Sequence, residues 1–499
     1  MAHVGSLALV ITGLTLLAGS LHLPIPIAGW IGLLMALHGS RFLPASTAMV
    51  TVWIASVAIV GIAERGSIPA SGVAYLLIVV VLGFTLMVPF AIDRASGSFA
   101  RGGVGSTLVF PVAFVATEFL RSRVLPNATW GSIAYSQYGA LSLMQIAALT
   151  GIWGIVFLMA WSASTFDLGW RHSFASPTAR LPLLVFGCVF AAAVGAGTLR
   201  LARASTDRPT LRAATLNRPV DLFVPGEMAR ITEGSIAPAD RPSIDAKLIW
   251  LQDWFLEGSR REARAGARLV VWPEQNLLVF SEHETAFLAR AREVAADERI
   301  YLAMGMGTIH LGEPRPFENK LVLIDPTGRT LISYLKTHPV PGWEAGIMRR
   351  GDGRLPVTAT LDGRMAAAIC YDGSFPEFIR QAAEGSADLL ILPVNDWKGV
   401  RTAHFQMHAF RAIETGVPIV RAAASGISGA FDAWGRVIGF SDYFAPGERT
   451  LIVQLPIGGV RTIYARIGDT LAWVCVAGLV AVLVGVLGVG LLPIEAWAR

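Results

Sequence analysis

Apolar runs of membrane-spanning length dominate the first part of the chain, and one more lies near its end. A spanning helix needs about 20 mostly apolar residues. Eight segments approach this length: residues 6–22, 24–40, 47–63, 72–92, 105–120, 139–163, 182–199 and 470–492. No Lys or Arg precedes the first run and further runs follow closely, so it predicts a retained anchor rather than a signal peptide. The pattern predicts a polytopic α-helical membrane domain of about eight spans.

A different pattern fills the polar segment between the seventh and eighth runs. Short runs typical of buried strands cover residues 267–272, 300–307, 319–325, 364–370 and 388–394. Helical patterns cover residues 243–266, 282–298 and 404–416, the last with Gly416 at a C-cap position. This alternation predicts an α/β fold. The expected domains are residues 1–202 with seven transmembrane helices, residues 203–467 with the α/β fold, and residues 468–499 with the last transmembrane helix.

Composition agrees with a chain that lies partly in lipid. Of the 499 residues, 53% are hydrophobic and only 15% are charged, and the mean hydropathy is +0.54. The formal net charge of +5 is spread along the chain without a basic run. Nucleic-acid binding therefore receives no support.

The arginines between the runs predict which side of the membrane holds the polar domain. Short cytoplasmic loops attract positive charge. With the N-terminus inside, the inner loops hold Arg41, Arg94, Arg101, Arg171 and Arg180, and the outer loops hold Arg65, Arg121 and Arg123. This bias places the polar domain outside the cytoplasm, because an odd number of spans precedes it.

One of the three cysteines is a candidate for chemistry. Cys188 and Cys475 lie in apolar runs, which leaves Cys370 alone in the polar domain. A solitary cysteine is more often an inert core residue. Cys370, however, ends a predicted strand just before a helix-like segment, where backbone N–H groups and the positive end of a helix favour a thiolate.

Two further polar residues follow predicted strands. In the sequence Trp272-Pro273-Glu274, proline is expected to stop the strand ladder and place the Glu274 carboxylate beyond the sheet edge. Lys336 follows another strand, and Glu344 comes eight positions later. Functional groups gather beyond the carboxyl ends of strands in open α/β sheets. A cysteine nucleophile needs a base and an oxyanion donor, which this set supplies.

The order Glu274, Lys336, Cys370 resembles the nitrilase superfamily of carbon-nitrogen hydrolases, whose triad is Glu, Lys and Cys. The stretches "NDWKG" and "HFQMHAFRAIETGVPIVRAAASG" strengthen this resemblance. The chain looks like the membrane-anchored branch of that superfamily, the apolipoprotein N-acyltransferases. The stretch "YLKTHPVPGWE" and the residues from Thr117 to Leu158 resemble the corresponding regions of those enzymes. The resemblance implies a nitrilase-type αββα sandwich between membrane helices and no cofactor or metal.

The resemblance also implies a ping-pong reaction on lipids. Cys370, deprotonated by Glu274, would take a fatty acyl chain from a phospholipid as a thioester, and the N-terminal amine of a diacylated lipoprotein would then receive it. Lys336 and the backbone N–H of Tyr371 would hold the oxyanion, and Glu344 would order the site. Trp343 and Asp372 are further supporting or substrate-binding candidates. The expected location is a bacterial inner membrane, with membrane lipids as partners and the catalytic domain on the periplasmic side.

Other interpretations remain open at this stage. The same triad fits a membrane-bound amidase or a divergent acyltransferase with another amine acceptor. A non-catalytic scaffold predicts replacement of a triad residue, and none is replaced. Glu118 is a possible functional acid in the fifth run, although pairing with Arg121 is favoured. His404 and His408 have metal-ligand spacing, but no third ligand lies near them in the sequence, so packing or polar helix roles are favoured.

Overall fold

The computed structural model describes residues 2–23, 25–97, 102–204, 207–218, 222–224, 226–447 and 449–490. The chain divides into two compact units, one formed by Met1–Arg203 with Ile467–Arg499 and the other by Ala204–Arg466. Pro24, Arg101 and the end of the eighth expected span, with residues 491–499, lie outside the described residues.

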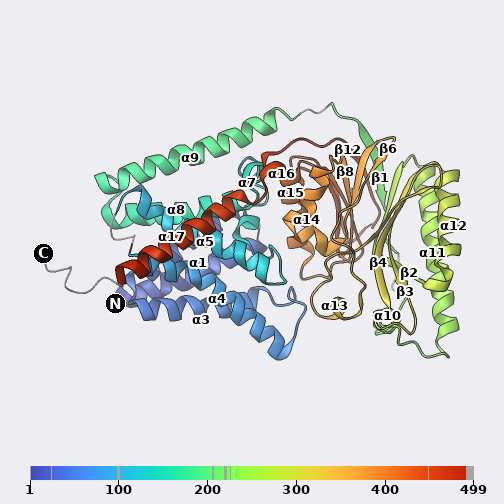
Figure 1. Cartoon of the computed structure of the whole chain (residues 1–499), viewed down its shortest axis with the longest axis horizontal. Coiled ribbons are helices and arrows are strands. Elements are labelled where there is room, and N and C mark those ends of the chain that lie inside the picture. Colours follow the sequence, from blue (N-terminus) through green and yellow to red (C-terminus); the bar gives the residue numbers. More distant parts are fainter. Residues whose placement is uncertain are drawn as a thin grey trace. The chain divides into compact units, whose positions relative to one another are not determined.

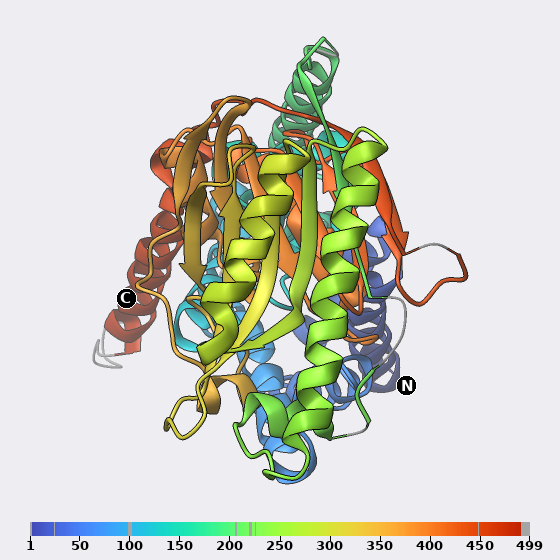
Figure 2. The ribbon, with the colours of Figure 1, turned by 90° about the vertical axis from the view of Figure 1, so that its right-hand side faces the viewer.

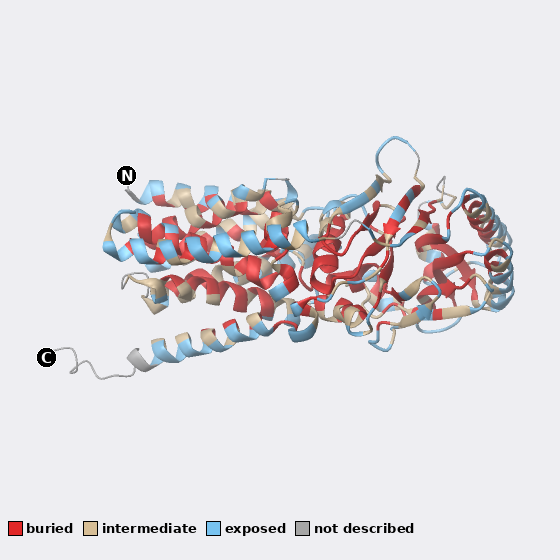
Figure 3. Cartoon of the chain, turned by 90° about the horizontal axis from the view of Figure 1, so that it is seen from above, coloured by how far each residue is buried: buried red, intermediate tan, exposed pale blue. Residues whose placement is uncertain are grey.

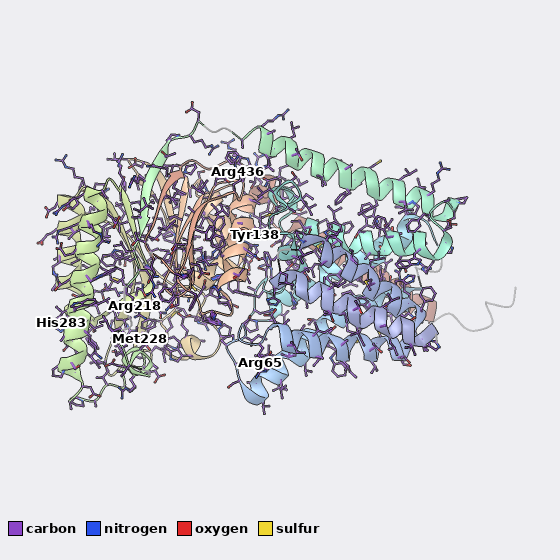
Figure 4. All side chains as sticks on the ribbon, turned by 180° about the vertical axis from the view of Figure 1, so that it is seen from behind. Arg65, Tyr138, Arg218, Met228, His283 and Arg436 are labelled. Atoms are coloured by element: carbon purple, nitrogen blue, oxygen red, sulfur yellow. The ribbon has the colours of Figure 1, made fainter. Side chains whose placement is uncertain are left out.

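Helices form the first unit (Figure 1). Its described elements are α1 (Ala2–His22), α2 (Pro26–Phe42), α3 (Ala45–Ala63), α4 (Gly72–Ser96), α5 (Val104–Val124), η2 (Ile133–Gln137), α6 (Leu141–Met144), α7 (Ala147–Thr150), α8 (Trp153–His172), α9 (Pro177–Ala202) and α17 (Thr470–Gly490). Tyr138, labelled in Figure 4, directly follows η2.

The helices of this unit account for the expected spans with two differences. Among the described residues, six helices are long and apolar enough to cross a membrane, and a seventh span exists if a bent pair counts as one. The second expected span is the 17-residue helix α2. The sixth was expected as one helix over residues 139–163, and this is wrong. The chain there bends by 117° between Leu141–Thr150 and Trp153–His172. Gly151, with φ of 66°, ends α7 at this break.

Apolar side chains cover the outside of several spans, as lipid contact requires. On α4, Val73 is 72% exposed, and Leu76 and Leu77 are also exposed. Figure 3 shows exposed and intermediate positions along the helices of this unit. Large exposed apolar surfaces are rare in soluble proteins but normal where lipid covers them. The chain is therefore a multi-pass membrane protein.

Charged groups inside this unit are paired with one another. The Arg41 guanidinium lies 2.6 Å from Asp93 on α4 and also pairs with Asp167 on α8. His38 on α2 and Arg171 on α8 lie 2.7 and 2.8 Å from the same Asp167. Burying a charge in a membrane helix is costly unless it is paired. This network ties α2, α4 and α8 together.

The second unit contains two six-stranded sheets. Its strands are β1 (Thr210–Thr215), β2 (Leu269–Phe280), β3 (Tyr301–Ile309), β4 (Phe317–Ile324), β5 (Thr330–Leu335), β6 (Val357–Thr360), β7 (Gly363–Ala367), β8 (Leu389–Val394), β9 (Ile419–Ala423), β10 (Ile427–Phe431), β11 (Val437–Asp442) and β12 (Leu451–Pro456). Its helices are α10 (Glu227–Thr232), α11 (Arg241–Arg264), α12 (Ser281–Asp297), α13 (Trp343–Ile347), η3 (Cys370–Ser374), α14 (Pro376–Glu384) and α15 (Arg401–Thr415), and α16 (Ile463–Ile467) ends at the boundary between the units.

The two sheets pack face to face between two layers of helices, as the predicted αββα sandwich requires (Figure 1). The sheet orders are β12-β1-β2-β3-β4-β5 and β11-β10-β9-β8-β7-β6. Figure 2 shows α11 and α12 across the outer face of the first sheet, and Figure 4 labels His283 on α12 and Met228 on α10. Helices α14 and α15 cover the second sheet. The buried core between β2 and its helices includes Trp272 and Phe255, whose rings lie 4.9 Å apart.

The predicted strands of this unit are all present, and parallel pairing brings their ends together. Strands β1, β2 and β3 run parallel, as do β7, β8 and β9. Strand β5 is antiparallel to β4, which is antiparallel to β3, so β5 runs in the same direction as β3. The carboxyl ends of β3 and β5 therefore lie at one edge of the first sheet. Gly416 adopts the left-handed conformation at the end of α15, as predicted.

Candidate active site

A large bulge in β2 carries Glu274. Trp272 pairs with Met304 of β3, but the next pair is Leu277 with Met306, so residues 273–276 stand opposite the single residue Gly305. Proline was expected to stop the strand ladder and place the carboxylate beyond the sheet edge; the ladder is interrupted after Trp272, but the expected end of the strand is wrong. The strand continues to Phe280, and Glu274 is only 2% exposed. The bulge turns the carboxylate into the protein because it frees these residues from the ladder.

Glycine at position 305 is what allows the bulge to fit. A Cβ atom there would lie 2.6 Å from the Pro273 carbonyl oxygen and 2.9 Å from the Glu274 Cα. Gln275, inside the bulge, has a φ of 55°, a conformation uncommon for a residue with a side chain. The backbone around Glu274 is thus shaped by a close approach of two strands.

The Lys336 ammonium joins two buried carboxylates. Its Nζ lies 2.8 Å from Glu274 Oε1 and 2.8 Å from Glu344 Oε2. Asn319 of β4 donates from Nδ2 to the same two residues, at 2.7 Å to Glu274 and 2.9 Å to Glu344. The backbone N–H of Val340 donates to Glu344 at 2.7 Å. Two carboxylates with one ammonium and an amide between them form a closed polar cluster.

Cys370 lies beside this cluster at the start of η3. Two residues separate it from Ala367, the last residue of β7, whereas the strand was predicted to run to Cys370 itself. Its φ of 46° lies in the left-handed region, which costs a non-glycine residue about 1–3 kcal/mol. Its thiol lies close enough to the Glu274 carboxylate and the Asn395 backbone N–H for both to affect its pKa. The structure thus brings Glu274, Lys336 and Cys370 into one site.

Burial sets the protonation of these three groups. Burial raises the pKa of Cys370 well above its usual value, and the nearby Glu274 charge raises it further, although Lys336 opposes this. Burial also raises the pKa of Glu274, against the pull of Lys336. For Lys336 burial acts to lower the pKa, but the charges of Glu274 and Glu344 outweigh it and hold the pKa well above normal. The site therefore rests with a neutral thiol beside a firmly charged ammonium.

Asp372 connects the Cys370 segment to the Lys336 segment. Its carboxylate is fully buried and accepts hydrogen bonds from the Tyr334 hydroxyl at 2.7 Å, the His338 backbone N–H at 2.9 Å and the Ile369 backbone N–H at 3.1 Å. Tyr334 and His338 lie on either side of Lys336 in the chain. Asp372 therefore joins the two segments by hydrogen bonds, and its supporting role in the site remains a prediction.

The two aromatic candidates differ in exposure. Tyr371 is 8% exposed, and its ring lies 5.3 Å from that of Phe375 in an edge-on contact. Burial raises the pKa of Tyr371, so its hydroxyl stays protonated. Trp343, the first residue of α13, is 46% exposed and donates from Nε1 to Glu233 at 3.2 Å. A contact between either ring and a substrate remains a prediction.

Asp396 and His404, which were not predicted as site residues, also lie close to Cys370. The Cys370 sulfur, a carboxylate oxygen of Asp396 and a ring nitrogen of His404 lie within 4.8 Å of one another. The sequence offered no third ligand for the pair His404 and His408, and this group does not include His408; folding instead brings Cys370 and Asp396 to His404 from separate elements. Asp396 already accepts from His404 at 2.7 Å and from Arg421, whose charge opposes a cation there. His408, the other residue of that expected pair, is fully buried.

Glu118 lies in the helical unit, and its hydrogen bonds differ from the predicted pairing. Its carboxylate accepts from the Ser132 hydroxyl at 2.7 Å and from the Ile133 backbone N–H at 3.2 Å. Arg121 instead donates to the Trp130 carbonyl oxygen at 3.1 Å. Glu118 thus caps the start of η2.

Asn319, Asn395 and Asp396 were not singled out as site residues from the sequence. Asn319 is the first residue of the strand predicted at 319–325, between Glu318 and Lys320, so the sequence pattern gave no signal for it; the observed strand β4 begins two residues earlier, at Phe317. Asn395 and Asp396 directly follow the strand β8. Position just after a strand was the signal that identified Lys336, and it applies to them equally.

Comparisons with known proteins agree with this architecture. Residues 251–465 match the family model described as carbon-nitrogen hydrolase, and residues 12–165 match the model described as apolipoprotein N-acyltransferase N-terminal domain. An amidase from Nesterenkonia sp. has 22% sequence identity, a TM-score of 0.40, and an aligned region covering 49% of this chain and 90% of the amidase. The chain is therefore a membrane protein whose α/β unit is similar to the carbon-nitrogen hydrolases.

Two curated relatives extend the similarity to most of the chain. The apolipoprotein N-acyltransferase of Geobacter metallireducens is 26% identical, over 95% of this chain and 85% of the relative. That of Bradyrhizobium diazoefficiens is also 26% identical, over 81% of this chain and 76% of the relative. The chain resembles the apolipoprotein N-acyltransferases in both of its parts, and the resemblance predicted from the sequence is confirmed.

Proposed function

We propose that this chain is an N-acyltransferase that moves a fatty acyl chain from a phospholipid, through a thioester on Cys370, to the N-terminal amine of a diacylated lipoprotein. The observation that carries the proposal is the meeting of Glu274, Lys336 and Cys370 in one buried site. The two family matches and the relatives' names support the choice of acyl transfer.

In the first half-reaction the Cys370 sulfur attacks the ester carbonyl carbon of the phospholipid while its proton passes to Glu274. The carbonyl oxygen becomes an oxyanion, which Lys336 and the Tyr371 backbone N–H stabilise. The intermediate collapses, the C–O bond breaks, and the departing alcohol takes the proton back from Glu274. An acyl thioester and a lysophospholipid result.

In the second half-reaction the lipoprotein amine attacks the thioester carbonyl carbon and loses a proton to Glu274. The C–S bond then breaks and the sulfur regains that proton, so the thiol and an amide are formed. The same donors hold the oxyanion in both steps. The raised pKa of Glu274 suits this exchange, because a base whose pKa lies closer to neutrality can both accept and return a proton.

Attachment to the membrane follows from the substrates. Each methylene pulled from lipid into water costs about 0.8 kcal/mol, so a site fixed at the bilayer avoids that cost for both acyl-bearing partners. We place the chain in a bacterial inner membrane with the α/β unit on the periplasmic side, on the basis of the arginine bias between the spans.

A two-stage mass-spectrometric experiment tests the proposal. The purified full chain is first incubated with phosphatidylethanolamine vesicles, and a mass increase of one acyl chain on the Cys370 peptide is expected. A diacylated lipopeptide is then added, and the acyl group should move to its amine. C370A is the control and should acquire no acyl group. Release of free fatty acid with no transfer to the peptide would select the hydrolase interpretation instead.

A further inference from the structure

Asp396 is a buried acid close to Cys370 that the reaction above does not use. It comes two residues after β8, and its exposed fraction is 4%. Both of its oxygens are engaged, Oδ1 by His404 Nδ1 at 2.7 Å and Oδ2 by Arg421. The Arg421 guanidinium, from β9, also donates to the Ile427 carbonyl oxygen. Asp396 is thus clamped from a helix on one side and a strand on the other.

The residue next to Asp396 contacts both the proposed base and the nucleophile. The Asn395 backbone N–H donates to Glu274 Oε2 at 2.7 Å, and it lies close enough to Cys370 to lower the pKa of the thiol. That N–H belongs to the peptide that joins Val394, the last residue of β8, to Asn395, and Asp396 is the next residue along the chain. Packing restrains the Asp396 side chain, because a Cβ on Gly426 would lie 2.6 Å from Asp396 Oδ2. The pairing of Val394 with Ala423 and the clamp on Asp396 therefore restrain Asn395 from both sides.

We propose that Asp396, held by His404 and Arg421, is a positioning residue that aims the Asn395 N–H at Glu274 and Cys370. This assignment rests on the proposed acyl transfer, which requires the acid and the sulfur in reacting geometry. Displacement of a reacting group by about 1 Å can cost about 100-fold in rate. His404 acts through Asp396 in this arrangement, because its Nδ1 already faces that carboxylate.

The charges that face Cys370 make the proposal measurable. They are Glu274 from β2, Lys336 after β5 and Asp396 after β8, with His404 on α15 also near the sulfur. Arg421 on β9 contacts Asp396, and the His408 ring lies 4.4 Å from that of His404. After burial and Glu274, the Asp396 charge is a further cause of the raised pKa of Cys370. Its removal, which also leaves the Arg421 charge uncompensated, should lower the pKa of Cys370.

The first test compares thiol alkylation with acyl transfer in the Asp396→Asn variant of the full chain. Alkylation of Cys370 by iodoacetamide, followed by peptide mass spectrometry across pH, should reach its half-maximal rate at a lower pH than in the wild type. Acylation of Cys370 from phosphatidylethanolamine should fall about 100-fold. A more acidic thiol that reacts more slowly with its substrate is not expected from loss of stability alone.

The second test separates positioning from proton transfer at His404. Asn can donate to Asp396 from its side-chain amide, whereas Leu cannot. His404→Asn should keep acylation within about tenfold of the wild type, the cost of one weakened hydrogen bond. His404→Leu should lose about 100-fold. If both variants are equally inactive while Cys370 is still alkylated, His404 itself moves a proton and the positioning assignment is wrong.

Glu414→Gln provides the matched control. Glu414 pairs with Arg411 in an equally buried ion pair on α15, ten residues and therefore about 15 Å along the helix from His404. The Glu414→Gln variant should lower the melting temperature without shifting the pH dependence of Cys370 alkylation. If Asp396→Asn behaves the same way, Asp396 is merely structural and the proposal fails. If alkylation shifts as expected but even the wild type transfers no acyl group, the proposed function fails while the positioning of Cys370 stands.

Discussion

At the scale of single residues, the site depends on how many charges share a small buried volume. Glu274 and Glu344 are both within 3 Å of the Lys336 ammonium. Two acids with one cation leave the site with an excess of negative charge. Burial is the main cause of the raised pKa of Glu274, and the negative charge of Glu344 raises it further. Glu344 thus affects the protonation of Glu274 without any need to contact the substrate itself.

The Glu344→Gln variant tests this adjustment. Glu274 must be ionised to accept the thiol proton, and its raised pKa means that activity is lost on acidification at a higher pH than for an ordinary Glu. Removal of the Glu344 charge should lower the pKa of Glu274 and move the acid limb of kcat/KM for Cys370 acylation to lower pH. An acid limb that stays in place or moves upward would contradict the assignment.

Asp372 is predicted to matter through the segments it connects. Asp372→Asn replaces a charged acceptor by a neutral one and should cost about 1.5–3 kcal/mol of unfolding free energy. The rate of Cys370 acylation should fall about 100-fold as Lys336 shifts. Asp325→Asn is the control, because Asp325 accepts from the Thr327 and Arg329 N–H groups in a turn after β4. That variant should lose stability while its rate stays near the wild-type value.

At the scale of secondary-structure elements, the β2 bulge is the feature on which the site depends most. A regular strand would alternate its side chains between the two faces and would keep residues 273–276 in the ladder. The bulge instead turns Glu274 toward Lys336, and it does so only because Gly305 lets β3 approach closely. Element geometry here determines where a functional group points.

Gly305→Ala should therefore disturb the site although the new methyl group is apolar. The clash with the Pro273 carbonyl should cost about 1–3 kcal/mol and reduce Cys370 acylation by about 100-fold through displacement of Glu274. Gly346→Ala is the matched control, because a Cβ at this exposed position on α13 meets no atom within 4 Å. Equal effects of the two variants on melting temperature and rate would contradict this role of Gly305.

At the scale of the whole molecule, the orientation of the chain in the membrane decides which lipids and proteins can reach the site. In a Cys188→Ala, Cys475→Ala background, Leu361→Cys lies in the α/β unit at 90% exposure, and Ala175→Cys lies in the loop between α8 and α9. A membrane-impermeant maleimide added to spheroplasts should label the first position and leave the second unlabelled until detergent is added. The reverse pattern would place the α/β unit in the cytoplasm.

The sequence by itself determined most of the spans, the α/β domain and the three residues of the proposed triad, because each depends on local information. Apolar run length reports a membrane helix, and a polar residue just after a buried strand reports the functional edge of a sheet. Tertiary structure alone decided the break at Gly151, the burial of Glu274 in a bulge, and the meeting of Asp396 and His404 with Cys370. These depend on contacts between residues far apart in the chain, and hydrophobic periodicity carries no information about which such residues will touch.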